Sequence, residues 1–206
     1  ESFDTSLVRS SLVNYLLARQ SADYVPAVLS GEGGDELFAG YHYLKDLDED
    51  DLALELVDIT RQLHNTALQR VDRCSRAHAL EAYVPFVNAQ VLDYALTIPT
   101  DYKIRRKGDA VEKWILRRAV NGLLPEDVVN RPKVKFWEGA GVAELLSRHA
   151  DSEITAAEFE RERDLPDGSH LATREEMMYY RIFRDHFSQL SDISFVGRTR
   201  PAAPAQ

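Results

Sequence analysis

The chain has 206 residues, of which 44% are hydrophobic and 29% charged, a composition typical of a globular protein with a substantial core. Its net charge of −9 offers no basic surface for nucleic acid, and no apolar run reaches the ~18 residues of a membrane span. Cys74 is the only cysteine, which excludes an internal disulfide and fits a reducing compartment. We therefore expect a cytoplasmic protein of one or two domains that binds neither nucleic acid nor membrane.

Residues 4–20 predict an amphipathic helix, which Asp4 or Thr5 is placed to cap. Its apolar side chains recur on one face, namely Val8, Leu12, Tyr15 and Leu16. Val25–Leu29 follows and predicts a short buried strand.

The rest of the chain is predicted to be almost entirely helical. The acidic segment Asp46–Asp51 is interpreted as a solvated loop, and apolar residues at three- and four-residue spacing predict one long helix over 52–82. Val84–Phe86 contains a proline and ends that helix. Shorter helices are predicted near residues 88–97, 110–121, 141–157 and 172–188. The predicted fold class is α/β and predominantly helical, with about one strand and about seven helices.

The most informative stretch is the glycine-rich segment Ser30–Glu36, with the sequence SGEGGDE, which follows the predicted strand. Its glycines let the backbone approach a ligand closely, and a divalent cation between its carboxylates and a phosphate would balance their charges. Two interpretations stay open on these residues alone. The segment is either a nucleotide or pyrophosphate site at the carboxyl end of a strand, or a glycine turn with a solvated acidic face.

The wider sequence resembles the asparagine synthetase family, glutamine-dependent enzymes that make asparagine from aspartate and ATP. Blocks similar to the family's occur in the family's order: ESFDTSLVRSS (1–11), SGEGGDELFAGY (30–41), DRCSRAHALEAYVPF (72–86), EKWILR (112–117), LPEDVVNRPKVKFWEGAG (124–141) and LATREEMMYYRIFRDHF (171–187). The resemblance implies that residues 1–190 are the C-terminal portion of a synthetase domain, a partial adenine-nucleotide alpha-hydrolase-like (ATP pyrophosphatase) fold. A disordered tail is expected over residues 191–206.

This resemblance implies an amide-forming ligase reaction with ATP and Mg²⁺. ATP would activate the side-chain carboxylate of aspartate as an acyl-adenylate, and ammonia from an upstream glutaminase domain would then displace AMP. Neither the family's Ser-Gly-Gly-x-Asp-Ser type ATP pyrophosphatase loop nor the leading cysteine of its glutaminase domain is found in this sequence. We therefore expect a larger parent enzyme and no turnover by this chain alone. An apolar face that missing strands leave uncovered would favour self-association, with a homodimer as its simplest form.

The resemblance also assigns roles within the glycine-rich segment. Ser30 and Gly31 match positions that contact the AMP portion of ATP. Glu32 matches an acid at the reacting carbonyl, where it would bind substrate and hold ammonium or accept a proton. Asp35 matches the residue associated with magnesium and pyrophosphate, whereas Glu36 is expected to be structural.

Basic residues elsewhere complete the expected site. Lys133 matches the family's key catalytic lysine, whose ammonium would stabilise charge on the adenylate phosphate and the carbonyl oxygen. Arg73 matches a position that contacts pyrophosphate, and Arg9 one that tunes substrate handling. Lys113 and Arg117 lie four apart on one helical face, for which a solvated or ion-paired face is the preferred interpretation.

Some positions depart from the family pattern. Tyr83 stands where an arginine is usual, Asn88 where an aspartate is usual, and Arg76 where the residue is generally apolar or small. After Lys133, the usual Ser-Asp-Gly appears here as Trp137-Glu138-Gly139. These departures leave two alternatives open: another amide-forming enzyme, of the β-lactam synthetase or peptide cyclase type, or a non-catalytic interaction module that retains the helical half of the fold.

Overall fold

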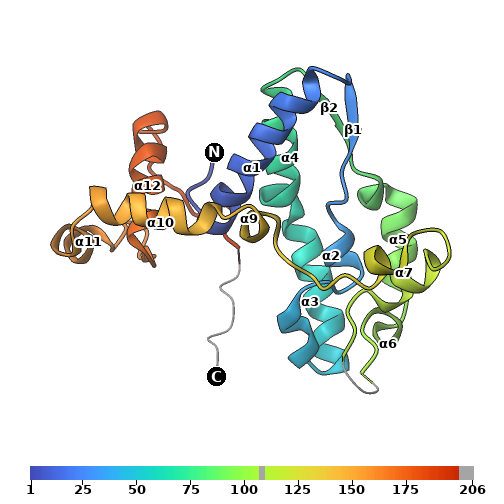
Figure 1. Ribbon diagram of the computed structural model, residues 1–206. Helices are drawn as coiled ribbons and strands as arrows, with labels where there is room; N and C mark the ends of the chain where they lie inside the picture. Colours follow the sequence, from blue (N-terminus) through green and yellow to red (C-terminus); the bar gives the residue numbers. More distant parts are fainter. Residues whose placement is uncertain (107–109, 200–206) are drawn as a thin grey trace. The chain divides into compact units, whose positions relative to one another are not determined.

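The computed structural model describes residues 1–106 and 110–199 (Figure 1). These residues form two compact units, which we describe separately. Unit 1 comprises residues 1–25, 69–80 and 135–199, and unit 2 comprises residues 26–68 and 81–134. Helix α4 (Ala67–Arg76) begins in unit 2 and continues into unit 1.

Unit 2 contains a pair of short parallel strands, β1 (Ala27–Leu29) and β2 (Glu81–Tyr83), in which Val28 pairs with Ala82. Its longest helix is α3 (Glu49–Gln62), which contacts the single-turn helix α2 (Gly34–Leu37). The other α-helices of this unit are α5 (Ala89–Thr97), α6 (Thr100–Lys103), α7 (Trp114–Ala119) and α8 (Glu126–Val129). Short 3-10 turns cover His42–Asp46, Leu63–Asn65 and Pro85–Val87.

Two apolar clusters fill unit 2. The first consists of Ala39, Leu44, Leu52, Leu56 and Ile104, and it joins α3 to the segment after α2. The second consists of Leu37, Phe38 and Ala95, and it joins α2 to α5. Leu37 ends α2 and lies in the second cluster, and Ala39, two residues further on, lies in the first, so the C-terminal end of α2 is anchored in the core of unit 2.

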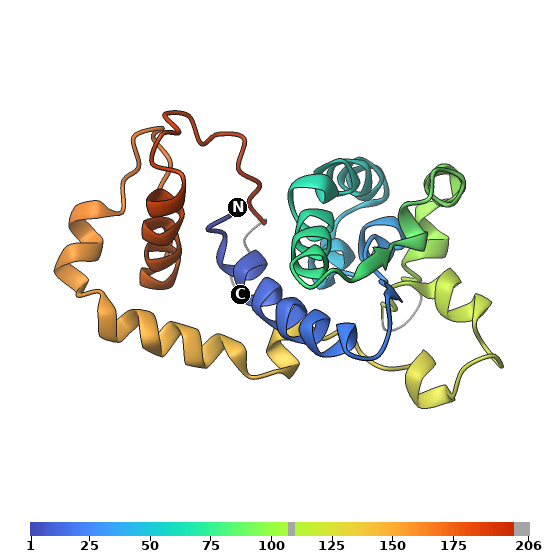
Figure 2. The same ribbon diagram turned by 90° about the horizontal axis from the view of Figure 1, so that it is seen from above.

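Unit 1 is helical and contains α1 (Thr5–Ala22), α9 (Phe136–Gly139), α10 (Val142–Glu153), α11 (Ala156–Glu162) and α12 (Arg174–His186). Helix α12 packs across α10, and both contact α1 (Figures 1 and 2). Side-chain caps explain where these helices begin: Asp4 accepts a hydrogen bond from Leu7 N, and Thr155 and Glu158 form a capping box. No helix in the described part of the chain is long and apolar enough to cross a bilayer.

The structure confirms a predominantly helical α/β fold and the helices expected near 4–20, 88–97 and 172–188. The single long helix over 52–82 is wrong. Its apolar periodicity continues through α3 and α4, but the 3-10 turn Leu63–Asn65 and Thr66, which is not helical, separate them. Ala79 then adopts a left-handed conformation (φ 53°) and Leu80 N bonds to Ser75 O, so the chain leaves α4 and enters β2.

The acidic segment Asp46–Asp51 is also not a loop throughout. Asp48 caps α3 by accepting a hydrogen bond from Asp51 N, and the acids Glu49, Asp50 and Asp51 occupy its first turn. Negative side chains are favourable there because they face the positive end of the helix dipole. The same acids therefore have a structural role in starting α3.

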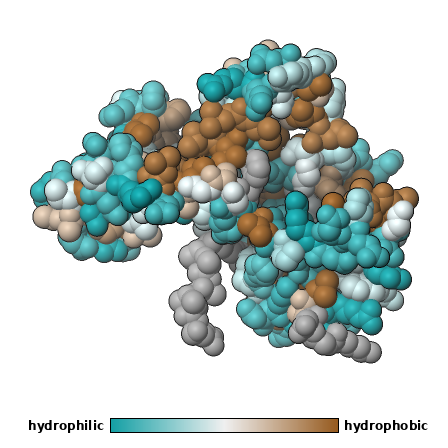
Figure 3. Space-filling view, viewed as in Figure 1, coloured by the Kyte–Doolittle hydropathy of each residue, from teal (hydrophilic) through white to brown (hydrophobic). Residues whose placement is uncertain are grey.

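Burial differs from the expectation at two predicted elements. Leu29 of β1 is 78% exposed, since β2 is the one strand that pairs with β1 in the described residues. On α1, Leu12, Tyr15 and Leu16 are each more than a third exposed, and Figure 3 shows apolar side chains over this helix. The helical spacing predicts the helix but cannot tell what covers its apolar face.

Residues 191–199, which were expected to belong to a disordered tail, are packed into unit 1. Ile193 is buried in the core of unit 1, and Thr199 donates hydrogen bonds from its N–H and hydroxyl to Asp4. This segment is irregular but packed, because it supplies both an apolar side chain and partners for the cap of α1. The rest of the expected tail, residues 200–206, lies outside the described residues.

Candidate functional site

The glycine-rich segment leaves β1 and turns directly into α2. Ser30 N donates to Tyr83 O at 2.8 Å, which continues the strand pairing by one residue. Gly33 has φ 88°, and a Cβ on it would lie 3.0 Å from Val87 Cγ1; a Cβ on Gly34 would lie 3.1 Å from the Phe86 ring. These glycines therefore let the segment lie tightly against the Pro85–Val87 turn, a packing that side chains would obstruct.

Asp35, near the start of α2, lies between two lysine side chains. Its Oδ2 accepts a hydrogen bond from Lys133 Nζ at 2.9 Å. Its Oδ1 is 2.9 Å from Lys113 Nζ, an ion pair without the alignment of a hydrogen bond. These three side chains form what we call the lysine–aspartate cluster. It carries one net positive charge and is partly open to solvent, with 24% of each lysine side chain exposed.

The charge of Asp35 depends on both lysines. Burial is the largest single effect and raises the pKa of Asp35, but the charges and close contacts of Lys113 and Lys133 together outweigh it, so the pKa is lowered. Asp35 is therefore ionised at neutral pH. Its contribution to stability is present above the usual aspartate pKa and is lost as the pH falls through the lowered value.

Gly40 makes room for this cluster. A Cβ at Gly40 would lie 1.9 Å from Asp35 Oδ1 and 2.3 Å from Lys113 Cε. Its N–H also donates to Asp35 O at 2.8 Å. The close approach of the Asp35 and Lys113 side chains is therefore possible only with glycine at this position.

Gly40→Ala is expected to displace the Asp35 side chain and lower the free energy of unfolding by about 1–3 kcal/mol, as overpacking of a tightly packed site does. Urea denaturation of the 206-residue chain measures this effect. Gly31→Ala is the matched control, since a Cβ on Gly31 would meet nothing within 4 Å. Equal stabilities of the two variants would contradict the packing argument.

Two backbone carbonyls that precede Lys133 in the sequence accept hydrogen bonds from one arginine. Arg117 donates to the carbonyl oxygens of Val129 and Arg131, the latter at 3.1 Å. The ring Nε2 of His42 lies 3.3 Å from Lys133 O. Because Lys133 lies in an irregular segment between α8 and α9, these contacts are what hold its backbone in place.

Arg117 is itself anchored by a buried carboxylate. Glu112 pairs with Arg117 at 2.7 Å and with Lys45 at 2.8 Å, and only 8% of its side chain is exposed. Burial raises the pKa of Glu112, but the hydrogen bond from Lys45 and the charges of Lys45 and Arg117 lower it to about 2. Lys45, Glu112 and Arg117 thus support the segment that carries Lys133.

This buried carboxylate predicts an acid-sensitive contribution to stability. The pKa of Glu112 is about 2 in the folded chain against an ordinary value of 4.5, so its contribution of about 3 kcal/mol is complete above pH ~4.5. About 2 kcal/mol of it is lost by pH 3. The free energy of unfolding is measured with urea at pH 6 and at pH 3. Between these two pH values it should fall by about 2 kcal/mol less in Glu112→Gln than in the wild type. Glu126→Gln, at an exposed glutamate, should follow the wild type; equal acid sensitivity of all three proteins would refute the assignment.

A second buried carboxylate lies beside the cluster. Glu36 is 5% exposed and accepts a short hydrogen bond from the Tyr41 hydroxyl. Burial raises the pKa of Glu36, and the charges of Asp35 and Glu32 raise it further. Glu32 is therefore close enough to Glu36 for their charges to interact. The expectation that Glu36 is structural agrees with its burial and its hydrogen bond.

The two predicted arginines belong to unit 1. Arg9 donates to both carboxylate oxygens of Glu175, from Nε at 2.8 Å, and its guanidinium lies over the Trp137 ring at 4.9 Å. Arg73 is on the solvent-exposed side of α4 and pairs with Glu1 and Asp72. The structure thus brings Asp35 and Lys133 together in unit 2, while the roles of Arg9 and Arg73 stay predictions.

Comparison with known proteins gives the family. The asparagine synthase family model matches residues 1–57 and 48–202. The chain belongs to the asparagine synthase family. A glutamine-hydrolysing asparagine synthetase of Sandersonia aurantiaca is 32% identical over 205 residues, which cover 92% of this chain and 38% of that protein. The corresponding protein of Gallus gallus is 30% identical over 91% of this chain and 35% of its own length. This asparagine synthase family chain therefore spans little more than a third of these relatives.

Two of the departures from the pattern of the asparagine synthase family have local structural accounts. Asn88 caps α5 by accepting a hydrogen bond from Gln90 N, a role that asparagine and aspartate fill equally well. Trp137 is buried under the guanidinium of Arg9. The Tyr83 ring is half exposed, and the structure gives no reason for an aromatic residue there.

Sequence reasoning missed three residues of this site. The sequence predicts an ion-paired or solvated face for Lys113, and its amine is indeed ion-paired, with Asp35. Gly40 and Glu112 were not singled out, although both lie in or beside the family-like blocks. Lys113 also has a left-handed backbone (φ 53°), which is unusual for lysine and cannot be read from the sequence.

The residues present fit a magnesium ion shared with phosphates. Proteins commonly hold Mg²⁺ through one or two carboxylates together with substrate phosphates, and Asp35 supplies one such carboxylate. In the described ranges, no group of three or more His, Cys, Asp or Glu side chains is placed to hold a metal. Asp35 is the residue of this site that would hold such an ion together with substrate phosphates.

Proposed function

We propose that this chain forms part of the synthetase domain of a glutamine-dependent asparagine synthetase. Such an enzyme adenylates the side-chain carboxylate of aspartate and transfers ammonia to it. The observation that carries the proposal is the lysine–aspartate cluster, in which Lys113 and Lys133 each lie 2.9 Å from Asp35 at the end of a glycine-rich segment. Membership of the asparagine synthase family supports the same reaction.

The charges of the cluster suit the handling of phosphates. Two ammonium groups converge on one carboxylate, so the cluster retains a positive charge that a pyrophosphate or adenylate can neutralise. Gly31, four residues before Asp35 in the sequence, has open space at its Cβ position, which lets a ligand approach the backbone. Both features are what an enzyme needs when negative charge grows on phosphate oxygens.

Adenylation would form a bond between an oxygen of the aspartate side chain and the α-phosphorus of ATP, and the bond to pyrophosphate would break. Lys133 stabilises the charge on the phosphate in this step, and Lys113 pairs with the departing pyrophosphate. Ammonia then attacks the activated carbonyl, AMP leaves with the bridging oxygen, and Glu32 accepts the proton from nitrogen. Ser30 and Gly31 are proposed to hold the AMP portion.

Asp35 is the proposed ligand for Mg²⁺, and the ion, when bound, would neutralise charge on the phosphates. Arg73 is proposed to contact pyrophosphate and Arg9 to orient the substrate. The ammonia is proposed to come from glutamine through a glutaminase domain of the same enzyme. Cytoplasmic location and a homodimer are further proposals for the full-length protein.

The test is the exchange of labelled pyrophosphate into ATP by the full-length protein that carries this chain. We expect exchange that depends on both Mg²⁺ and aspartate. Exchange with another carboxylate, in an assay that includes a panel of amines, would favour the β-lactam synthetase or peptide cyclase type. No exchange with any carboxylate would favour the non-catalytic module.

A further inference from the structure

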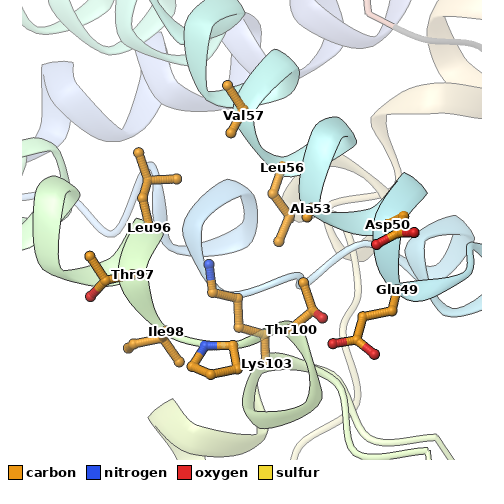
Figure 4. A pocket seen from close by; sticks show the side chains of 11 residues that line it. Glu49, Asp50, Ala53, Leu56, Val57, Leu96, Thr97, Ile98, Thr100 and Lys103 are labelled. Carbon is orange, nitrogen blue, oxygen red and sulfur yellow. The ribbon is translucent and has the colours of Figure 1, made fainter.

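Unit 2 contains a cavity of about 310 Å³ that shares no residue with the lysine–aspartate cluster. It lies between α3 on one side and the segment from the end of α5 to α6 on the other. Leu56, Val57 and Leu96 provide apolar walls (Figure 4). A cavity of this volume is at the small end of the range for ligand sites in proteins.

Lys103 is the unusual member of the lining. It is only 2% exposed, and Figure 4 shows its amine pointing into the cavity between the side chains of Leu96 and Leu56. Within residues 1–106 and 110–199, no hydrogen bond or ion pair reaches this amine. Buried lysines are rarely left without a partner, because a desolvated ammonium is costly.

The single turn of α6 explains how the amine comes to lie there. Pro99 precedes this helix and Ile104 ends it in a fully buried position, so the backbone on both sides of Lys103 is fixed. The aliphatic stem of Lys103 is therefore buried, and its amine faces the cavity. Burial lowers the pKa of Lys103 to about 8, so most of the amine is still charged at neutral pH.

We propose that this cavity binds a small monocarboxylate with a short aliphatic chain, whose carboxylate pairs with Lys103 and whose chain packs against Leu56 and Leu96. The ligand would supply the counter-charge that the protein lacks at this amine. Thr100, which is buried beside Lys103, offers a hydroxyl to the same carboxylate. This inference does not depend on the proposed function, since none of its residues takes part in that reaction.

The charge at the cavity restricts the class of ligand. Glu49 and Asp50, both in the first turn of α3, line the cavity and are the negative groups that face it. Their repulsion disfavours phosphates and dicarboxylates, whereas one carboxylate is balanced by Lys103. We therefore infer a single negative charge on the ligand.

The test uses butyrate as the probe and butyramide, its uncharged analogue, as the control. In the 206-residue chain labelled with ¹⁵N at lysine Nζ, the Lys103 signal is assigned by its absence from Lys103→Met. We expect butyrate to raise the midpoint of the Lys103 titration from about 8 and butyramide to leave it unchanged. Butyrate affinity should fall about tenfold from pH 7 to pH 9 as the free amine loses its proton.

Two variants complete the test. Lys103→Met keeps a side chain of similar volume and should lower butyrate affinity at least tenfold, as loss of a charge-assisted hydrogen bond does. The double change Glu49→Gln and Asp50→Asn should tighten butyrate binding about threefold by removing repulsion. The proposal is overturned if butyrate leaves the Lys103 titration unmoved in the folded wild type, or if butyramide binds equally well.

Discussion

Lys133→Met is expected to lower the turnover number of asparagine formation about 10²- to 10³-fold in the full-length protein. The loss follows from the position of the amine, 2.9 Å from Asp35, where it can stabilise charge on the phosphate and the carbonyl oxygen. Preorganised groups of this kind stabilise the transition state more than the bound substrate. The KM for aspartate should therefore change much less than kcat. The measurement is steady-state kinetics with ammonia as the nitrogen source.

Lys135→Met is the matched control for this variant. Lys135 lies two residues further on, and its amine lies 5.4 Å from the centre of the Trp137 ring in unit 1. We expect its substitution to change kcat less than threefold. Equal losses in the two variants, or an unchanged kcat in Lys133→Met, would remove the catalytic role proposed for Lys133.

Glu175→Gln is expected to lower the free energy of unfolding by about 3–5 kcal/mol, which is the usual cost of breaking a buried ion pair by removing one partner. Glu175 is 3% exposed and accepts hydrogen bonds from Arg9 and, at 2.7 Å, from the Tyr179 hydroxyl. The neutral amide leaves the guanidinium of Arg9 without a counter-charge. Urea denaturation of the 206-residue chain measures the loss.

A double substitution separates the charge from the packing. Replacing both partners, Arg9→Met with Glu175→Leu, should recover much of the loss because no buried charge is left unpaired. Glu144→Gln breaks an exposed pair with Arg148 and should cost under 1 kcal/mol. If Glu175→Gln costs no more than Glu144→Gln, then Arg9 is not held by this pair and its proposed role in substrate handling gains weight.

A capping residue in the sequence predicted where the first helix begins. Asp4 is one of the two residues placed to cap the first predicted helix, and α1 begins directly after it. The break between α3 and α4 was not predicted, since apolar spacing is the same on both sides of Leu63–Asn65. The strand β2 was missed for a related reason: three residues carry too little periodicity to distinguish a strand from a helix end.

The site was predictable only where a motif pointed to it. The family-like blocks indicated Asp35 and Lys133, and the structure brings their side chains together across 98 positions of sequence. Gly40 could not be found this way, since its importance arises from the Asp35 and Lys113 side chains that would collide with a Cβ. The sequence also gives no signal for Lys103, because nothing in it distinguishes a buried lysine from an exposed one.

The most direct test of the account follows oxygen through the reaction. Aspartate labelled with ¹⁸O in its side-chain carboxylate is supplied with ATP, Mg²⁺ and ammonia to the full-length protein, and the AMP is analysed by mass spectrometry. If that carboxylate attacks the α-phosphorus, AMP should leave with one ¹⁸O atom for each asparagine formed. Asparagine formed together with unlabelled AMP, or with the label in inorganic phosphate, would contradict adenylation.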